Sequence, residues 1–206
     1  MTKQQLRFWA GLFTFVLVMR LLPYILSKAG MPLSPSFTWY PWNFSPMLAA
    51  CLFAGACLKD RRWAYTAPLV VFAVSNFLMW AITQDFDFAF SPSQPLIATC
   101  FAGVTWLGTT FSKSPQWRWA LPAGVLAEGV FFLVTNFAVW ALVEGTPYPP
   151  TFGGLWLCYV AGLPFIGKSL VSTVIFTSVF FSPWVLSLAG VGETRTRPSM
   201  VGVRAE

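Results

Sequence analysis

The chain has 206 residues, of which 56% are apolar and 10% are charged, and its formal net charge is +6. Soluble domains carry about 25% charged residues, so this composition excludes an ordinary water-exposed globular protein. The mean hydropathy of +0.64 instead indicates helices that pack against one another in lipid.

The apolar segments, in chain order, predict one transmembrane domain over residues 1–190. Six spans are expected at residues 8–26, 45–58, 64–83, 95–111, 119–143 and 169–189, with a shorter apolar segment at 151–166. Residues 191–206 are expected to form a flexible basic cytoplasmic tail. The predicted fold class is therefore an all-α membrane protein, a six-helix transmembrane bundle with one or two short or re-entrant segments.

The first segment resembles a signal peptide only superficially. Lys3 and Arg7 precede an apolar run of nineteen residues, and no small-x-small cleavage site follows it. We expect an uncleaved first span.

Two segments are too short for simple spans. Residues 45–58 fall below the ~20 residues that a crossing needs, so this segment is either tilted or partly re-entrant. Residues 151–166 are interrupted by Gly162 and Pro164. They form either a broken helix at membrane depth or a short interfacial helix on the outer surface.

Charge asymmetry predicts the orientation in an inner (cytoplasmic) membrane. With the N-terminus inside, ten of the thirteen basic residues fall on the cytoplasmic side, and Asp85, Asp87 and Glu144 fall outside. The positive-inside rule therefore favours cytoplasmic N- and C-termini. Topology accounts for the basic charge, so the lipid bilayer is the expected partner and nucleic acid is not.

Residue usage argues against catalysis and metal binding. The chain lacks histidine, which excludes a histidine-based metal site and a Ser-His hydrolase. Its four cysteines lie in apolar runs without CxxC spacing and are expected to be small buried residues. We expect neither an enzyme nor a bound cofactor or metal.

An aromatic cluster precedes the second predicted span. It contains Trp39, Tyr40, Trp42 and Asn43. Such residues usually form an interfacial belt, but they are also suited to cap an outward-facing ligand pocket. In the second reading, a further wall comes from Tyr148, Trp156 and Tyr159.

Glu128 is the most unusual residue of the fifth predicted span. It follows Arg118 by ten residues, about 15 Å along a helix, which is half of a ~30 Å hydrocarbon core. An uncompensated carboxylate there costs roughly 2.5 kcal/mol or more. Three roles remain open: a neutral acid bonded between helices, a proton site or a ligand contact. Thr135 and Asn136 lie on the same broad side of this helix, whereas Ser75 and Asn76 are expected to bond between helices.

Two sequence signatures carry a family resemblance. They are Tyr40-Pro41-Trp42-Asn43-Phe44-Ser45-Pro46 with Leu52-Phe53-Ala54-Gly55-Ala56, and Thr135-Asn136-Phe137-Ala138-Val139-Trp140 with Tyr148-Pro149 and Cys158-Tyr159-Val160-Ala161. Together they resemble an uncharacterised family of small bacterial membrane proteins described only as transport proteins. Its organisation is similar to that of the substrate-binding S components of energy-coupling-factor (ECF) transporters. The resemblance implies a six-helix bundle with an outward-facing pocket for a ligand of vitamin-like size, and adds Trp140 to the candidate contacts.

The resemblance leaves the energising partner open. S components carry an Ala-x-x-x-Ala pattern in the first span for docking to the coupling subunit, and this chain has Ala10, Thr14 and Val18 there. The expected function is capture of a small molecule from the extracytoplasmic side for uptake, driven by an ECF-type module or an ion gradient. The alternative is a non-transporting scaffold that acts through its cytoplasmic loops and tail.

Overall fold

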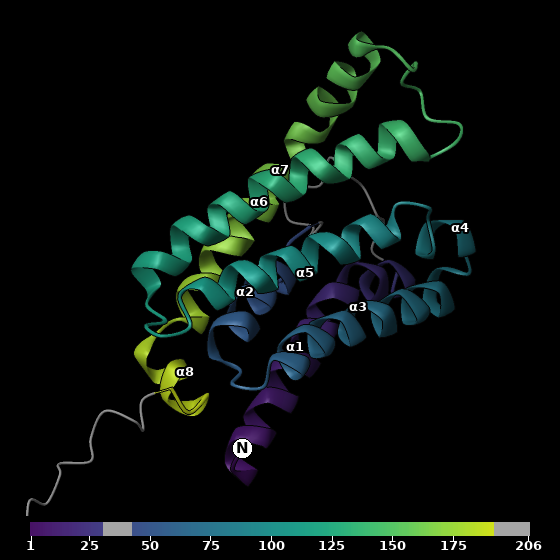
Figure 1. The fold of residues 1–206 in the computed structure, drawn as a ribbon. Coiled ribbons are helices and arrows are strands. Elements are labelled where there is room, and N and C mark those ends of the chain that lie inside the picture. The colour runs from purple at the N-terminus through teal and green to yellow at the C-terminus, as the bar shows by residue number, and fades with distance from the viewer. Residues whose placement is uncertain (31–42, 192–206) are drawn as a thin grey trace, which may run out of the picture.

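The computed structural model describes residues 1–30 and 43–191, and every regular element in these ranges is an α-helix (Figure 1). The all-helical fold class predicted from the sequence is thus confirmed. The elements are α1 (Lys3–Lys28), α2 (Met47–Cys57), α3 (Arg61–Thr83), α4 (Phe86–Ala89), α5 (Gln94–Thr110), α6 (Trp117–Leu142), α7 (Phe152–Phe180) and α8 (Pro183–Leu188).

Four of these helices, α1, α3, α6 and α7, are long and apolar enough to cross a membrane. Large apolar side chains on them remain exposed, among them Leu126, Leu133 and Leu163. A water-soluble protein would bury most such residues, whereas lipid solvates them without cost. The helices therefore have the character of a multi-pass membrane protein.

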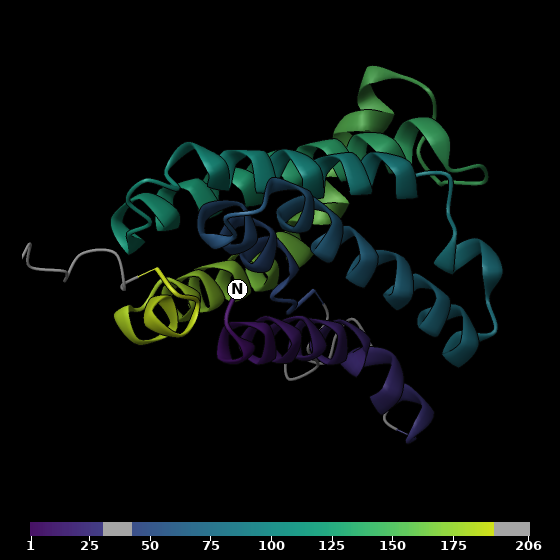
Figure 2. The same ribbon diagram turned by 60° about the horizontal axis from the view of Figure 1, so that its bottom comes forward.

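Helix α2 is short and enclosed by protein. All eleven of its residues are buried, and α1, α3, α5, α6 and α7 all contact it. Figure 2 shows this helix in the middle of the bundle. At ~1.5 Å per residue it spans about 16 Å, roughly half of a hydrocarbon core. The short segment predicted at residues 45–58 is therefore an internal half-length helix.

Two glycines allow α2 and α5 to approach closely. A β-carbon added at Gly55 would overlap the backbone carbonyl of Thr105, and one added at Gly108 would overlap the carbonyl of Leu52. Small residues at such crossings let helix backbones touch, which is a main source of packing energy in lipid. This crossing fixes α2 inside the bundle.

Helix α7 corrects the prediction for the last third of the chain. A break at Gly162 and Pro164 was expected between two apolar segments, but one helix runs through both residues. Proline is tolerated within transmembrane helices because neighbouring groups re-satisfy the freed carbonyl. The chain breaks instead at Phe181, after which the Ser182 hydroxyl caps α8.

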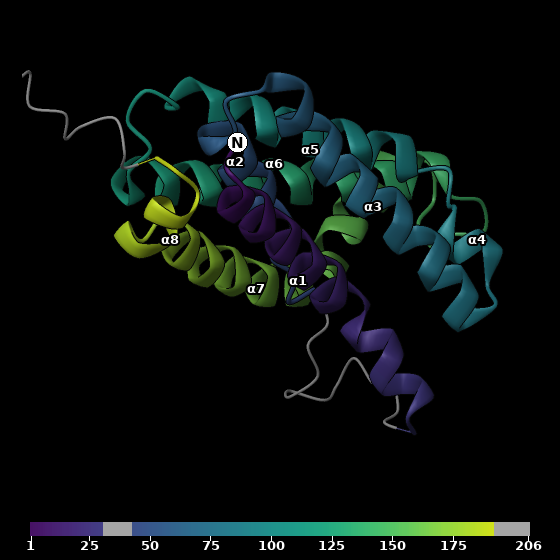
Figure 3. The same ribbon diagram turned by 90° about the horizontal axis from the view of Figure 1, so that it is seen from below.

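The charged connections gather at opposite ends of the bundle. One end, here called the basic end, holds the start of α1, the α2–α3 turn, the α5–α6 turn and α8 (Figures 1 and 3). Arg61 joins two of these turns, because its guanidinium donates to the Gly55 carbonyl at 3.2 Å and the Ser112 hydroxyl at 3.3 Å. The other end, the acidic end, holds α4 and the α6–α7 connection, with Asp85, Asp87 and Glu144.

Candidate functional site

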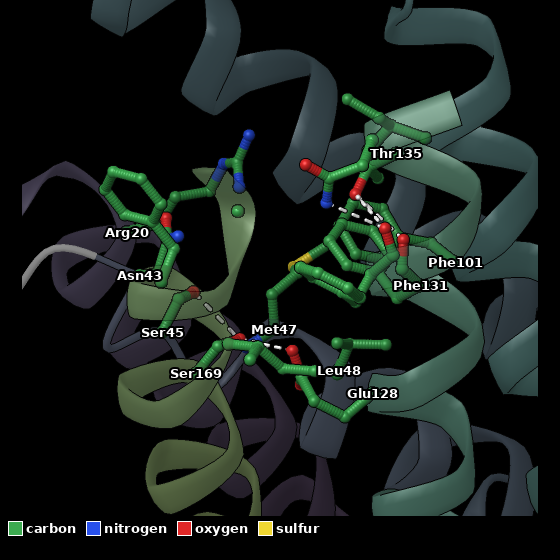
Figure 4. A pocket seen from close by; sticks show the side chains of 16 residues that line it. Arg20, Asn43, Ser45, Met47, Leu48, Phe101, Glu128, Phe131, Thr135 and Ser169 are labelled. Atoms are coloured by element: carbon green, nitrogen blue, oxygen red, sulfur yellow. Dashed lines mark hydrogen bonds between the residues drawn. The ribbon is translucent and has the colours of Figure 1, made fainter. Parts of the chain in front are cut away.

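A cavity of about 280 Å³ lies between α1, α2, α5, α6 and α7 (Figure 4). It forms where α2 begins halfway through the bundle, because none of the described helices occupies the space beyond the start of α2. The lining residues are Arg20, Asn43, Ser45, Met47, Leu48, Ile97, Phe101, Glu128, Phe131, Phe132, Thr135, Asn136, Gly162, Phe165, Ile166 and Ser169.

The backbone leading into α2 is not helical, and polar contacts hold it. The carbonyl of Ser45 accepts a hydrogen bond from the Ser172 hydroxyl at 3.0 Å. Asn43 has a φ of 58°, a left-handed conformation that asparagine tolerates better than most residues. Irregular backbone at membrane depth is tolerated where protein or a polar cavity surrounds it. This segment meets that condition.

Glu128 lies at one end of the cavity and is only 2% exposed. Two hydroxyls of α7 donate to its carboxylate, Ser169 to Oε1 and Thr173 to Oε2, the latter at 2.6 Å. The N-terminal residues of α2, Met47 and Leu48, line the same cavity. Hydroxyl donors and the N-terminal end of a helix both complement negative charge. Glu128 therefore bonds between helices and also faces the cavity.

Arg20 of α1 lines the cavity as well, and the sequence interpretation missed it. Its Nε donates to the Ser75 hydroxyl at 2.7 Å and its Nη2 to Asn76 Oδ1 at 3.3 Å. Its guanidinium carbon lies 5.0 Å from the centre of the Phe72 ring, a cation–π contact. The signal was available, because Arg20 interrupts an apolar run just as Glu128 does.

The expected role of Ser75 and Asn76 is confirmed. Both accept hydrogen bonds from α1, and the Asn76 amide donates to Gln94 Oε1 on α5 at 3.1 Å. These bonds link α1, α3 and α5 through polar side chains inside the helical bundle. They hold the Arg20 guanidinium in place at the cavity wall.

The two charged groups occupy opposite ends of the cavity, with Met47 between them (Figure 4). Within the described ranges, the hydrogen-bond partners of both are neutral: Ser75 and Asn76 for Arg20, and two hydroxyls for Glu128. Within the described residues, the guanidinium and the carboxyl group therefore face the same cavity without contacting each other.

The rest of the wall combines aromatic and aliphatic side chains with a few amides and hydroxyls. Phe101 and Phe131 stack with ring centres 5.5 Å apart and an interplanar angle of 16°. The Asn136 amide donates to the Phe132 carbonyl at 2.8 Å, and its oxygen lies against Gly162. The cavity therefore combines flat apolar surface with a few fixed polar groups, as small-molecule sites do.

The candidate contacts from the sequence divide into three groups. Asn43, Glu128, Thr135 and Asn136 line the cavity. The structure does not bring four others to it, namely Trp140, Tyr148, Trp156 and Tyr159. Trp39, Tyr40 and Trp42 lie outside the described residues.

Three of the residues away from the cavity stabilise or line the α6–α7 pair. The Trp140 indole N–H donates to the Pro149 carbonyl at 2.9 Å, and the Tyr159 hydroxyl donates to the Leu133 carbonyl at 3.1 Å. Trp156 and Tyr159 also line a separate apolar groove on the α6–α7 surface.

Metal-ligating side chains are not clustered. Across residues 1–30 and 43–191, no group of three His, Cys, Asp or Glu side chains is placed to hold a metal ion. The four cysteines are free thiols, and Cys51, Cys57 and Cys158 are buried, as expected of small apolar residues. The side chains that the cavity offers to a ligand are therefore its ionisable, polar and aromatic groups.

Comparison with known proteins gives one match. No curated protein and no solved structure matches the chain. A family model does, that of a family of unknown function named DUF6580, and it covers residues 2–192. The chain therefore belongs to the DUF6580 family.

Proposed function

We propose that this protein captures a small molecule in the cavity beside α2 as the binding component of an uptake system in a bacterial inner membrane. The observation that carries the proposal is the presence of Arg20 and Glu128 in the wall of one cavity at membrane depth. Ionisable side chains within transmembrane segments are rare and commonly mark substrate or ion pathways.

The proposed topology has six crossings. Helices α1, α3, α5, α6 and α7 make five, and α2 together with the backbone before it makes the sixth. The basic end faces the cytoplasm, because Lys and Arg concentrate in cytoplasmic loops. The extracytoplasmic side then holds the acidic end. Six crossings with an outward-opening pocket are also the arrangement that the resemblance to ECF S components implies.

In the proposed function, another component supplies the energy for uptake. Its sequence contains no ATP-binding motif, so inward release requires a partner ATPase module or an ion gradient. Helix α1 carries Ala10, Thr14 and Val18 where S components carry their docking pattern. An ion gradient is therefore an equally suitable energy source.

Cysteine labelling tests the topology. In a background without the four native cysteines, Lys28→Cys and Asp87→Cys are expected to react with a membrane-impermeant maleimide added to intact spheroplasts. Lys59→Cys and Lys113→Cys should react only after the membrane is opened, because they lie at the basic end. Labelling of all four positions from the same side would contradict six crossings.

A cavity-filling substitution tests ligand capture. Thr135→Phe places a ring in the cavity, whereas Leu133→Phe places the same ring outside it, on an exposed face of α6 beside the separate groove, where Leu133 is 53% exposed. We expect mass spectrometry of the purified protein to detect a co-purified small molecule that Thr135→Phe loses and Leu133→Phe keeps. Displacing a ligand of micromolar affinity removes about 8 kcal/mol of binding free energy.

Two results would contradict the proposed capture site. One is a co-purified compound that persists in Thr135→Phe at the level of the unaltered protein. The other is a protein that carries no small molecule and whose thermal stability responds to none in a metabolite library.

A further inference from the structure

We propose that the ligand is a zwitterion, a molecule of amino-acid size with one carboxylate and one ammonium group. This inference rests on the proposed capture function and names its substrate class. Its basis is the placement of Arg20 and Glu128 at opposite ends of a single cavity (Figure 4).

The Arg20 end suits a carboxylate. A guanidinium has five N–H donors, and the contacts to Ser75 and Asn76 use two of its nitrogens, Nε and Nη2. Within the described residues, Nη1 is left without an assigned acceptor while the side chain borders the cavity. Planar guanidinium groups pair with carboxylates through parallel N–H bonds, so a ligand carboxylate fits this end.

The Glu128 end suits an ammonium group. An ionised carboxylate offers about four acceptor positions, and the hydroxyls of Ser169 and Thr173 occupy one on each oxygen. The remaining positions can accept N–H donors from a ligand. These hydroxyls also fix the orientation of the Glu128 side chain, so ligand binding loses little conformational entropy in ordering it.

The two ends together select against ligands of a single charge. A buried charge is costly unless an opposite charge compensates it. An anion would compensate Arg20 but would place a second negative charge in the cavity with Glu128. A cation would compensate Glu128 but would be repelled by Arg20. A zwitterion compensates both residues and adds no net charge to the membrane interior.

The cavity volume limits the ligand to a small metabolite. The volume is about 280 Å³. This volume lies just below the ~300–1,000 Å³ range of drug-sized sites. Phe101 and Phe131 supply a flat apolar surface for the uncharged part of the ligand.

Binding assays on the unaltered full-length protein in detergent test the charge pattern directly. The twenty standard amino acids are screened by thermal shift, and dissociation constants are then measured by calorimetry. The strongest binder is compared with two analogues that lack its amine or its carboxylate. For phenylalanine these are 3-phenylpropionate and 2-phenylethylamine. Each analogue is expected to bind about ten- to hundredfold more weakly, because each leaves one buried charge without its partner.

Two variants then assign each charge to its residue. Arg20→Gln is expected to weaken amino-acid binding by at least about tenfold while leaving binding of the analogue without a carboxylate intact (2-phenylethylamine for phenylalanine). Glu128→Gln should weaken amino-acid binding to the same degree while sparing the analogue without an amine (3-phenylpropionate for phenylalanine). Lys28→Gln on α1 and Glu144→Gln beyond α6 are matched controls at exposed positions, and they should change none of the three affinities.

The outcomes separate this inference from the proposed function. Equal affinity for an amino acid and its analogues overturns the inference, as does a screen in which no amino acid binds. The analogue comparison uses the unaltered protein, so it does not depend on how well the variants fold. If a neutral or singly charged compound co-purifies and Thr135→Phe loses it, capture stands and the zwitterion assignment fails. If Thr135→Phe retains the compound, the capture site itself fails.

Discussion

Gly108→Ala is expected to destabilise the protein by more than about 3 kcal/mol, because the new methyl group meets backbone rather than a movable side chain. The β-carbon would overlap the carbonyl of Leu52 on α2 and lie 3.1 Å from the amide nitrogen of Ala56. Relief of this overlap requires α2 and α5 to separate, which opens the centre of the bundle. Thermal unfolding of the purified protein in detergent measures the loss.

Gly103→Ala is the matched control on the same helix. Among the described residues, a β-carbon at Gly103 would have no atom within 4 Å apart from the backbone of its own helix. Alanine there should maintain stability or raise it by up to about 1 kcal/mol, since it favours helix more than glycine does. Gly55→Ala should reproduce the Gly108 result from the α2 side, because its β-carbon would overlap the Thr105 carbonyl. Similar melting temperatures for Gly103→Ala and Gly108→Ala would contradict a backbone contact between α2 and α5.

The same substitution is expected to have opposite effects at two positions one turn apart on α7. Thr173→Val removes a hydroxyl that donates to Glu128 at 2.6 Å. Its expected cost is about 1.5–3 kcal/mol, the range for hydrogen bonds to charged groups. Thr177→Val removes a buried hydroxyl whose oxygen has no hydrogen-bond partner among the described residues. Valine should therefore stabilise the protein there by about 1 kcal/mol, because the buried polar atom is eliminated.

Combining each valine substitution with Glu128→Gln tests whether the Glu128 carboxylate is the partner of the Thr173 hydroxyl. If Thr173 acts through the carboxylate, the cost of Thr173→Val should shrink in the Glu128→Gln background, whereas the effect of Thr177→Val should be unchanged. Chemical denaturation of the unaltered protein, the three single variants and the two double variants gives the coupling energies. Shifts of the same sign for both valine substitutions would show that the hydroxyl contacts do not control stability at these positions.

Residue types and spacing predicted much of the helix pattern. The apolar runs at 8–26, 64–83 and 119–143 correspond to α1, α3 and α6, because any long helix in lipid must satisfy its own backbone and show an apolar surface. The runs after residue 150 were interpreted incorrectly. Gly162 and Pro164 disrupt helices in water, but α7 passes through both where it packs on α6.

The residues of the candidate site were predicted only in part from the sequence, because single-helix patterns reveal some of them and not others. Glu128 could be found from its depth alone, because a carboxylate is conspicuous in a long apolar run. Thr135 and Asn136 followed from helical periodicity on the same helix. Arg20 carried a comparable signal, because it also interrupts an apolar run, but the sequence interpretation did not assign it to the site. Tyr148, Trp156 and Tyr159 were predicted to form a pocket wall and Trp140 to contact the ligand, but none of them lines the cavity. The structure instead places Trp140 and Tyr159 in α6–α7 contacts, and Trp156 and Tyr159 in a separate groove.

The sequence by itself determined that this is a helical protein with membrane-spanning character and that a carboxylate lies deep within it. These properties depend on composition and local periodicity, which act within a single helix. Only the tertiary structure decided that α2 stops halfway through the bundle and that Arg20 and Glu128 face the same cavity. That result depends on contacts between distant segments, above all the Gly55 and Gly108 crossing, whose geometry is not encoded in the pattern of either helix alone.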